Sequence, residues 1–277
     1  MPAGGPTKRV PEEIRDVVVH LYKEGKSTQA IADLLCLSKP VCLKILRQRG
    51  VPRRQRGHPR QAPVHEDFFD NIDTEAKAYW LGFLVADGAV VGDYVKLRLS
   101  TKDLSHLELF RDTLSPGRTI YTIHRPHSQS EVCLFSPHLV IALAEHNVVQ
   151  NKTWTVRVSP KVPPELMRHY WRGHCDGDGC VCYSPLRGNP HWVVEVVGNQ
   201  GLMEDLHSWL SAHVPELSKP VNTRGKLYRV SCGGTGKPRL FAKALYEGAT
   251  VYLPRKMEEA QRLMAYKPMR KTKAFAA

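Results

Sequence analysis

The sequence predicts an α+β protein in which two similar halves follow a small, all-helical N-terminal domain. Three observations support this prediction. One segment recurs later in the chain, the same order of strand and helix patterns follows each copy, and the first part of the chain has the spacing of three short helices. The predicted divisions are residues 1–54 (helical domain), 55–73 (basic linker), 74–160 (first repeat), 161–265 (second repeat) and 266–277 (basic tail).

The charge of the chain is strongly basic and unevenly distributed. Lys and Arg outnumber Asp and Glu by 40 to 27 in 277 residues, which gives a formal net charge of +13. Residues 1–60 hold 13 Lys or Arg against 5 acids. A basic excess concentrated in this way favours a local nucleic-acid-binding module over a general contribution to solubility.

The cysteines and the hydropathy pattern exclude two classes of protein. The seven cysteines are an odd number and no secretory signal precedes them, so we expect reduced thiols and a cytoplasmic location rather than a disulfide scaffold. No apolar run approaches the roughly 20 residues that span a bilayer, so we expect no membrane role.

The N-terminal part has the pattern of a helix-turn-helix. A first helix opens at Pro11-Glu12-Glu13 and ends at Gly25, a second follows Ser27, and a third runs to Gly50 after a tight turn. The third helix would enter the DNA major groove, with Ser38, Lys39, Lys44, Arg47 and Gln48 available for contacts. The alternative is an ordinary helical bundle with a solvated basic face.

The segment that follows is rich in Arg, Pro and Gly, which predicts a linker rather than a helix or a buried strand. Its residues 56–60 (Arg-Gly-His-Pro-Arg) resemble an AT-hook, with His where that motif has Arg. Arginines in an extended segment fit a narrow minor groove, so we predict that Arg53, Arg54 and Arg56 contact DNA. A flexible basic tether is the alternative.

The strongest pattern is an internal repeat. Residues 78–90 read AYWLGFLVADGAV, and residues 169–181 read HYWRGHCDGDGCV. In both copies Tyr-Trp precedes a glycine, a small residue stands four positions after that glycine, and Asp-Gly closes the segment. The repeat therefore predicts two equivalent helices.

The small residues of the repeat predict how the two helices meet. Gly82 and Ala86 share one helix face, as do Gly173 and Gly177, so the two backbones can approach closely. We expect each helix to end at its Asp-Gly, with the glycine in the left-handed conformation. Asp87 and Asp178 would then lie side by side at a shared end, where two carboxylates favour a divalent cation, Mg²⁺ or Mn²⁺.

The two segments resemble the paired motifs of LAGLIDADG homing endonucleases, with residues 80–88 and 171–179 at the nine motif positions. The resemblance covers about residues 74–256, roughly two thirds of the chain. It includes two closing phrases, Asn151-Lys152-Thr153 after the first repeat and Leu245-Tyr246 through residues 252–256 (Tyr-Leu-Pro-Arg-Lys) after the second.

The resemblance implies a pseudo-twofold pair of αββαββα repeats, whose saddle of strands sits in the major groove of double-stranded DNA. It also implies a site-specific endonuclease that binds metal through the acid before each final glycine, here Asp87 and Asp178 with the adjoining Gly88 and Gly179. The first acidic position of the motif, Val85 in one copy and Asp176 in the other, varies in the family and is not the metal ligand.

Strand and helix patterns follow each motif in the same order. In the first half we expect strands over residues 94–100, 118–124 and 131–136, with helices over 103–114 and 137–145; in the second half we expect strands over 191–197, 221–222 and 226–232, with helices over 202–213 and 238–247. The predicted DNA contacts in this part are Lys96, Arg98, Arg118, Arg125, Lys152, Arg224 and Arg229. His124, Lys226 and Tyr228 are further polar candidates, and any of these side chains has a solvated strand position as its alternative.

The family often adds a basic residue beside each catalytic acid. On its expected strand position, Lys226 is the candidate in the second half. The first half has no lysine between Asp103 and Lys152, so the helper is missing there or is replaced by His124, Arg125 or Gln129. Such a difference would allow unequal cleavage rates on the two DNA strands.

Other functions remain open. A zinc site at His169, His174, Cys175, Cys180 and Cys182 is disfavoured because no pair of Cys-x₂-Cys units completes it. Self-splicing is disfavoured by the absence of an N-terminal Cys or Ser and a C-terminal His-Asn. A non-cleaving transcription regulator and an intron RNA maturase on the same fold are the alternatives. Because two motifs stand in one chain, we expect a monomer that binds an asymmetric DNA site.

Overall fold

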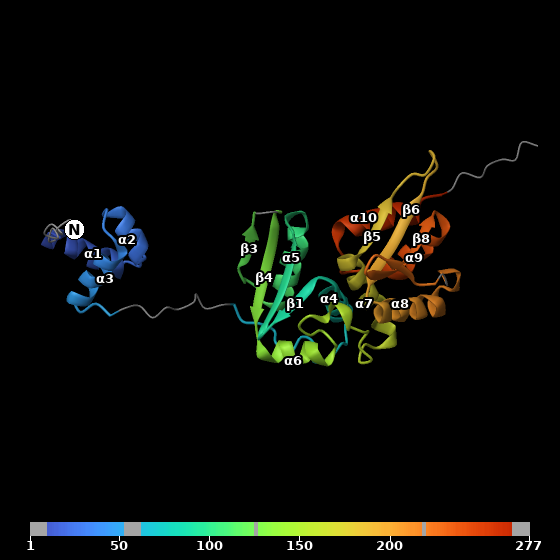
Figure 1. Ribbon diagram of the computed structural model, residues 1–277, viewed down its shortest axis with the longest axis horizontal. Coiled ribbons are helices and arrows are strands. Elements are labelled where there is room, and N and C mark those ends of the chain that lie inside the picture. The colour runs from blue at the N-terminus through green and yellow to red at the C-terminus, as the bar shows by residue number, and fades with distance from the viewer. Residues whose placement is uncertain (1–9, 53–61, 125–126, 218–219, 268–277) are drawn as a thin grey trace, which may run out of the picture. The chain divides into compact units, whose positions relative to one another are not determined.

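The computed structural model describes residues 10–52, 62–124, 127–217 and 220–267. The chain divides into two compact units, Met1–Gln61 and Ala62–Ala277 (Figure 1). Each unit has its own hydrophobic core. Within the described residues, no helix is long and apolar enough to cross a membrane.

The first unit consists of three helices, α1 (Glu12–Lys23), α2 (Thr28–Leu34) and α3 (Lys39–Gln48). Their apolar faces meet at a small core that includes Val18, Ile31 and Ile45. The hydroxyl of Ser27 accepts a hydrogen bond from the backbone N–H of Ala30 at 3.1 Å and so caps α2. A short turn joins α2 to α3, which is the arrangement predicted from the sequence.

The second unit contains the two predicted αββαββα repeats. The first repeat runs α4 (Glu75–Asp87), β1 (Gly88–Val91), β2 (Tyr94–Ser100), α5 (Leu104–Leu114), β3 (Ile120–Ile123), β4 (Gln129–Phe135) and α6 (Pro137–Glu145). The second runs α7 (Met167–Asp178), β5 (Gly179–Tyr183), β6 (Trp192–Gly198), α8 (Gln200–His213), β7 (Asn222–Arg224), β8 (Leu227–Gly234) and α9 (Gly236–Tyr246). A further helix, α10 (Pro254–Ala265), and short 3₁₀ turns at Thr101–Asp103, Lys152–Trp154, Pro164–Leu166 and Pro215–Leu217 complete the described part of the unit.

Each repeat forms a four-stranded antiparallel sheet with the same strand order, β1-β2-β4-β3 and β5-β6-β8-β7. The registers match as well. Gly88 pairs with Leu97, which pairs with Val132, and Gly179 pairs with Val196, which pairs with Val230. Helices α5 and α6 pack on one face of the first sheet, and α8 and α9 pack on one face of the second, so these helices leave the other face of each sheet uncovered.

Helices α4 and α7 pack against each other through their glycines, as the small residues of the repeat predict. A Cβ atom at Gly82 would lie 1.9 Å from the backbone oxygen of Tyr170, and a Cβ at Gly173 would lie 1.9 Å from that of Tyr79. The contact is therefore reciprocal, and it requires glycine on both sides because no side chain fits between the backbones.

Three details differ from the sequence-based expectations. Gly88 and Gly179 are extended rather than left-handed, because each helix passes directly into a strand. The structure adds α10, which buries Met257, Ala260 and Leu263 and was not expected. Part of the expected linker also packs on the first repeat, where the hydroxyl of Ser115 donates to the backbone oxygens of residues 62 and 63.

Candidate functional site

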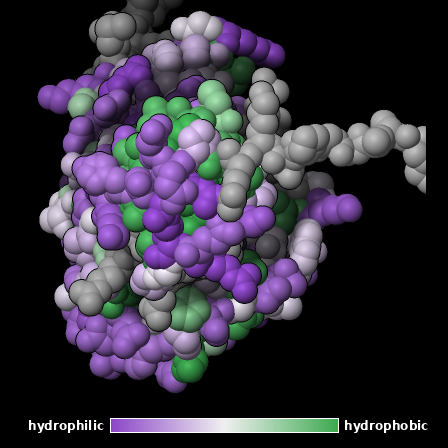
Figure 2. All heavy atoms as spheres, turned by 90° about the vertical axis from the view of Figure 1, so that its left-hand side faces the viewer, coloured by the Kyte–Doolittle hydropathy of each residue, from purple (hydrophilic) through white to green (hydrophobic). Residues whose placement is uncertain are grey.

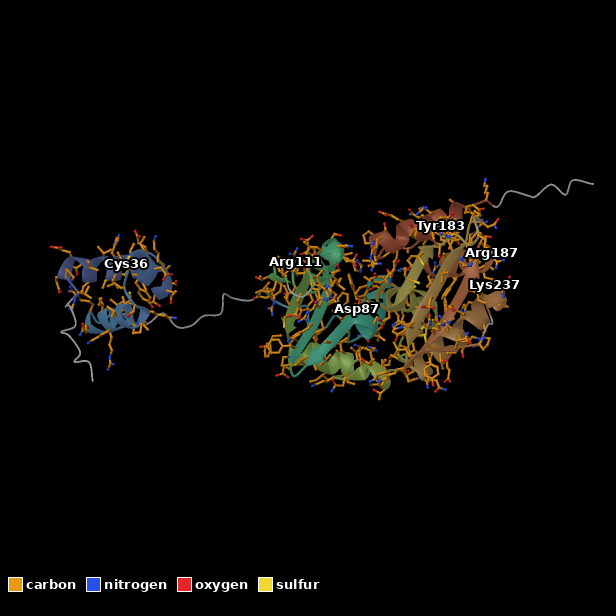
Figure 3. All side chains as sticks on the ribbon, turned by 45° about the horizontal axis from the view of Figure 1, so that its top comes forward. Cys36, Asp87, Arg111, Tyr183, Arg187 and Lys237 are labelled. Atoms are coloured by element: carbon orange, nitrogen blue, oxygen red, sulfur yellow. The ribbon has the colours of Figure 1, made fainter. Side chains whose placement is uncertain are left out.

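The two motif aspartates meet where the two repeats join. Asp87 is the last residue of α4 and Asp178 is the last residue of α7. A Cβ at Gly177, next to Asp178, would lie 3.4 Å from Oδ2 of Asp87, so the two helix ends are in contact. Figure 3 shows Asp87 at the junction between the two halves of the unit. The repeat thus brings one carboxylate from each half to a common place.

The electrostatics of this place are those of two competing negative charges. Desolvation by the surrounding protein and the charge of Asp178 raise the pKa of Asp87 to about 6. Lys256, Lys152 and Arg255 act in the opposite direction. Asp87 keeps exposed surface, so a ligand can reach it from solvent. Its raised pKa means that the surroundings disfavour the ionised carboxylate.

Two buried lysines flank the aspartates, one from the closing segment of each half. Nζ of Lys152 donates to the backbone oxygen of Gly88. Nζ of Lys256 donates to the backbone oxygens of Cys175, Asp176 and Gly179 at 2.7, 2.6 and 2.7 Å. A helix leaves its last carbonyls without intrahelical partners, and an ammonium group at that end satisfies them and complements the helix dipole.

The position of each lysine depends on residues from the other half. The side-chain amide of Asn199, in the second half, donates to the backbone oxygens of Thr153 and Val156 just after Lys152. Arg255, next to Lys256, donates to the carboxylate of Asp103 in the first half at 2.9 Å. Desolvation lowers the pKa of Lys152, and the charges of Asp178 and Asp87 counteract that shift.

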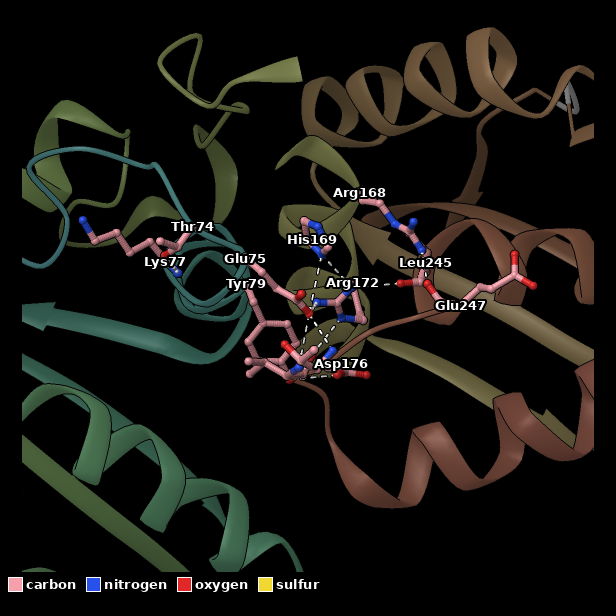
Figure 4. Close-up of polar contacts among 12 residues, drawn as sticks. Thr74, Glu75, Lys77, Tyr79, Arg168, His169, Arg172, Asp176, Leu245 and Glu247 are labelled. Carbon is pink, nitrogen blue, oxygen red and sulfur yellow. Dashed lines mark hydrogen bonds and ion pairs between the residues drawn. The ribbon is translucent and has the colours of Figure 1, made fainter. Parts of the chain in front are cut away.

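A buried network around Asp176 links the two helices to the second closing segment (Figure 4). The carboxylate of Asp176 accepts hydrogen bonds from the hydroxyls of Tyr79 and Tyr246 at 2.8 and 2.7 Å and from the backbone N–H of Leu253 at 2.7 Å. Since Leu253 directly precedes α10, this carboxylate helps to place Lys256. Asp176 is thus engaged by donors from within the protein.

A buried ion pair joins α7 to the first residue of α4. Arg172 of α7 has a fully buried side chain and donates to Glu75 of α4 at 2.6 Å. Glu75 also accepts from the backbone N–H groups of Thr250 and Val251. The loop before α10 is therefore fixed to the first residue of α4. Figure 4 shows Glu75 beside Arg172.

The donors at the site suit a hard divalent cation. Asp87 and Asp178 offer two carboxylates, and oxygen donors are what Mg²⁺ prefers. In the described part of the chain, no group of three or more His, Cys, Asp or Glu residues could hold a metal ion, so water and phosphate oxygens would complete the coordination. The carbonyls of Gly88 and Gly179, which we predict as further ligands, each accept a hydrogen bond from a lysine.

Lys226 lies away from the aspartates. The structure places it in the turn between β7 and β8, exposed, rather than on a strand. Val230 shares a row of the sheet with Gly179, two strands across, and Lys226 stands four residues beyond it, or about 13 Å along the strand. Lys152 and Lys256 are the lysines that the structure brings to the acids. Both lysines belong to the closing phrases identified in the sequence, but the sequence did not predict that either lies beside the acids.

The zinc alternative finds no support among the same residues. The imidazole of His174 contacts the backbone oxygen of Val197 at 3.1 Å, and that of His169 contacts the guanidinium of Arg172 at 2.9 Å. The thiol of Cys175 is buried and accepts a hydrogen bond from Tyr246. These three candidate ligands are thus engaged inside the protein.

The predicted DNA contacts on the sheets divide into exposed and internal positions. Lys96, Arg98 and Arg229 lie on the faces away from the helices, but Arg98 pairs with Glu131 at 2.6 Å and Arg229 with Glu195 at 3.0 Å. The expectation of surface contacts does not hold for Arg118, which is buried with Nε donating to the backbone oxygen of Cys133.

Lys152 is likewise buried, at 7% exposure, and belongs to the acidic pair rather than to the sheet surface. His124 is exposed just after β3, and Gln129 begins β4, so neither stands in for the missing helper in the first half. Arg53, Arg54, Arg56 and Arg125 lie outside the described residues, as does the side chain of Arg224 on β7.

The first unit presents its predicted contacts on one helix. Lys39, Lys44 and Arg47 are exposed on α3. Figure 2 shows mostly hydrophilic side chains on the face in view, with smaller hydrophobic areas between them. A helix with exposed cations, packed behind a short turn, has the geometry of a recognition helix.

Comparisons with known proteins extend to structures alone. No protein-family model and no curated protein matches the chain. The LAGLIDADG meganuclease I-AabMI bound to uncleaved DNA is 10% identical over 67% of this chain and 88% of that chain, with a TM-score of 0.45. Full-length DUF199/WhiA from Thermatoga maritima is 14% identical over 72% and 64%, with a TM-score of 0.43.

The LAGLIDADG homing endonuclease I-LtrWI bound to target DNA is 12% identical over 72% of this chain and 89% of that chain, with a TM-score of 0.44. These likenesses concern the arrangement of the elements. The chemistry of the site depends on the residues of this chain.

Proposed function

We propose that the chain is a divalent-metal-dependent, site-specific DNA endonuclease in which Asp87 and Asp178 provide the metal-binding carboxylates. The observation that carries the proposal is the meeting of these two acids at adjoining helix ends. Desolvation, together with the charge of Asp178, raises the pKa of Asp87 there. A fold gains no stability from two carboxylates placed in this way, whereas a cation and a phosphate group would balance them.

The surroundings of the acids support the same reaction class. Mg²⁺ or Mn²⁺ between the carboxylates would supply Lewis acidity and a more acidic bound water. Lys152 and Lys256 add fixed positive charge beside the place where a scissile phosphate would develop negative charge. Both acids belong to one chain, so a monomer contains the complete site.

Double-stranded DNA is proposed as the substrate from the charge and the shape of the protein. The net charge of +13 attracts a polyanion, and two sheets whose outer faces carry Arg side chains, together with an exposed basic helix, fit double-stranded DNA. A site-specific enzyme needs both phosphate and base contacts, and the cations together with the Arg–Glu pairs of the sheets offer both.

The test is cleavage of a duplex library, and of the DNA flanking the gene, by the full-length protein with Mg²⁺ or with EDTA. We expect metal-dependent double-strand breaks at one site. Asp87→Asn and Asp178→Asn should each abolish cleavage and retain DNA binding. Asp112→Asn, which changes an exposed acid on α5, is the matched control and should cleave normally.

Tight duplex binding without cleavage in either Mg²⁺ or Mn²⁺ would contradict the nuclease proposal and favour a non-cleaving transcription regulator. Preferential binding to structured intron RNA, with splicing promoted in its presence, would favour a maturase. Both outcomes retain a nucleic acid as the partner and remove the catalytic role of the acids.

A further inference from the structure

A row of apolar side chains crosses the outer face of the first sheet. Val91 of β1 pairs with Tyr94 of β2, and Tyr94 pairs with Phe135 of β4. The three side chains are 41–46% exposed, and the rings of Tyr94 and Phe135 stand 5.1 Å apart. Three large apolar groups that share one exposed row are unusual on a face that also carries Lys96, Arg98 and Glu131.

The second sheet lacks this row. Val91 and Tyr94 each stand three residues from the paired Gly88 and Leu97. At the same distance from the equivalent pair, Gly179 and Val196, the second sheet has Cys182 and Val193, and Val193 pairs with Gly233. The aromatic row is therefore not required by the αββαββα architecture, since the second repeat forms the same sheet with small side chains. Packing of the sheet alone does not account for it.

The surroundings of the row indicate what it contacts. Lys96 occupies the adjoining row of the same face, and Arg98 occupies the row beyond that. Three side chains are too small a patch for a stable protein interface, which needs about 800 Å² from each partner. Apolar groups beside cations on an antiparallel sheet fit the major groove of DNA, where the 5-methyl group of thymine is the apolar feature of the base edges.

We propose that Val91, Tyr94 and Phe135 read thymine methyl groups in one half of the DNA site, which makes them specificity-determining residues. The proposal rests on the proposed function, because it requires the outer sheet faces to contact duplex DNA. Its consequence is a target whose two halves are read by different chemistry. The half that meets the first sheet requires thymine at the contacted positions, and the half that meets the second sheet does not read methyl groups through this row.

The test begins by selecting bound duplexes from a randomised library with full-length Asp87→Asn protein, which removes cleavage. We expect thymines at fixed positions in one half of the selected site. Replacing those thymines with uracil, which lacks only the methyl group, should weaken binding about fourfold per contacted methyl group. Uracil in the other half should have no such effect.

The variant Tyr94→Ser/Phe135→Ser, in the same Asp87→Asn background, should bind thymine and uracil duplexes equally. Tyr121→Ser changes an exposed aromatic residue of the same sheet in a different row, and it should keep the preference for thymine. Since all three side chains are exposed, the variants should show unchanged melting temperatures.

Equal binding of thymine and uracil duplexes by the parent protein, alongside intact site-specific cleavage by the wild type, would overturn this inference and leave the proposed function in place. A thymine preference that persists in the double variant would overturn the assignment to this row. Failure to select any duplex would contradict the proposed function itself.

Discussion

At the scale of single residues, the site contains charged groups that lower the stability of the metal-free protein but suit the binding of a ligand. Asp87 is the plainest case, because its surroundings raise its pKa from the ordinary value of 3.8 to about 6. A carboxyl group whose pKa is higher in the folded state binds its proton more tightly there. The free energy of unfolding must therefore fall as the pH rises from about 4 to about 6 in the absence of metal.

We accordingly expect Asp87→Asn to stabilise the metal-free protein at pH 7 and to leave it unchanged near pH 4. The gain should be about 1 kcal/mol, less than the full pKa shift would give, because exposed surface screens the charge. Thermal melts in EDTA across this pH range, with Asp93→Asn in the β1–β2 turn as control, would measure it. Equal stabilisation at both pH values would contradict the electrostatic cause.

The site residues that could be predicted from the sequence lie in a recognisable motif, whereas those that could not are placed by contacts between distant parts of the chain. Asp87 and Asp178 stand at the same place in a repeated segment, so the repeat alone predicts their pairing. Lys256 follows Asp178 by a long stretch of chain and reaches the site through contacts that fix the loop before α10 and its start, among them those with Glu75 and Asp176. No periodicity or spacing in the sequence encodes those contacts.

At the scale of elements, the reciprocal glycine contact between α4 and α7 decides whether the two halves can join. Gly82→Ala would place a methyl carbon 1.9 Å from a backbone oxygen that cannot move without shifting α7. We expect a loss of about 3 kcal/mol or more in the free energy of unfolding. Denaturant titration would measure it.

Gly173→Ala makes the mirror-image contact and should lose a similar amount. Gly236→Ala at the first position of α9 is the matched control, because a Cβ there meets nothing within 4 Å. A Gly82→Ala variant as stable as this control would show that the helices can separate without loss.

The elements themselves could largely be predicted, and the exceptions have physical reasons. Alternating residues in β2 and the apolar face of α5 follow from the periods of strand and helix. The expected conformation of Gly88 was wrong because a glycine after a helix usually permits a left-handed turn, whereas here α4 passes directly into β1. Glycine is still required, because a Cβ would lie 2.6 Å from the backbone oxygen of Leu84. The position of Lys226 was mistaken because β7 and β8 are joined by a turn at Gly225.

At the scale of the whole molecule, the two units have separate hydrophobic cores and should separate in function too. We expect residues 62–277 expressed alone to melt within about 2 °C of the corresponding transition of the full chain, because no core residue of the second unit is lost. Calorimetry would test this. A lowered transition would show that the second unit depends on the first for its stability.

The same fragment should bind DNA with weaker salt dependence. The plot of log affinity against log salt concentration loses a slope of about 0.9 for each phosphate contact removed. Loss of Lys39, Lys44 and Arg47 would account for up to about 3 of the decrease in slope. Changing these three residues to Gln in the full chain should give that part of the decrease, and the fragment, which also lacks Arg53, Arg54 and Arg56, should show a larger one.

The segment that carries each buried lysine is held by a residue of the other half, and this has a consequence for the synthesis of the chain. Lys152 is held in place by Asn199, and Lys256 enters the site only with α10, so the first half remains unfinished while the second is still being translated. A chain released early by the ribosome would carry Asp87 without its counterpart. If the proposed function is correct, a complete site forms only after α10 has been synthesised, so products that end before residue 254 would not cleave DNA.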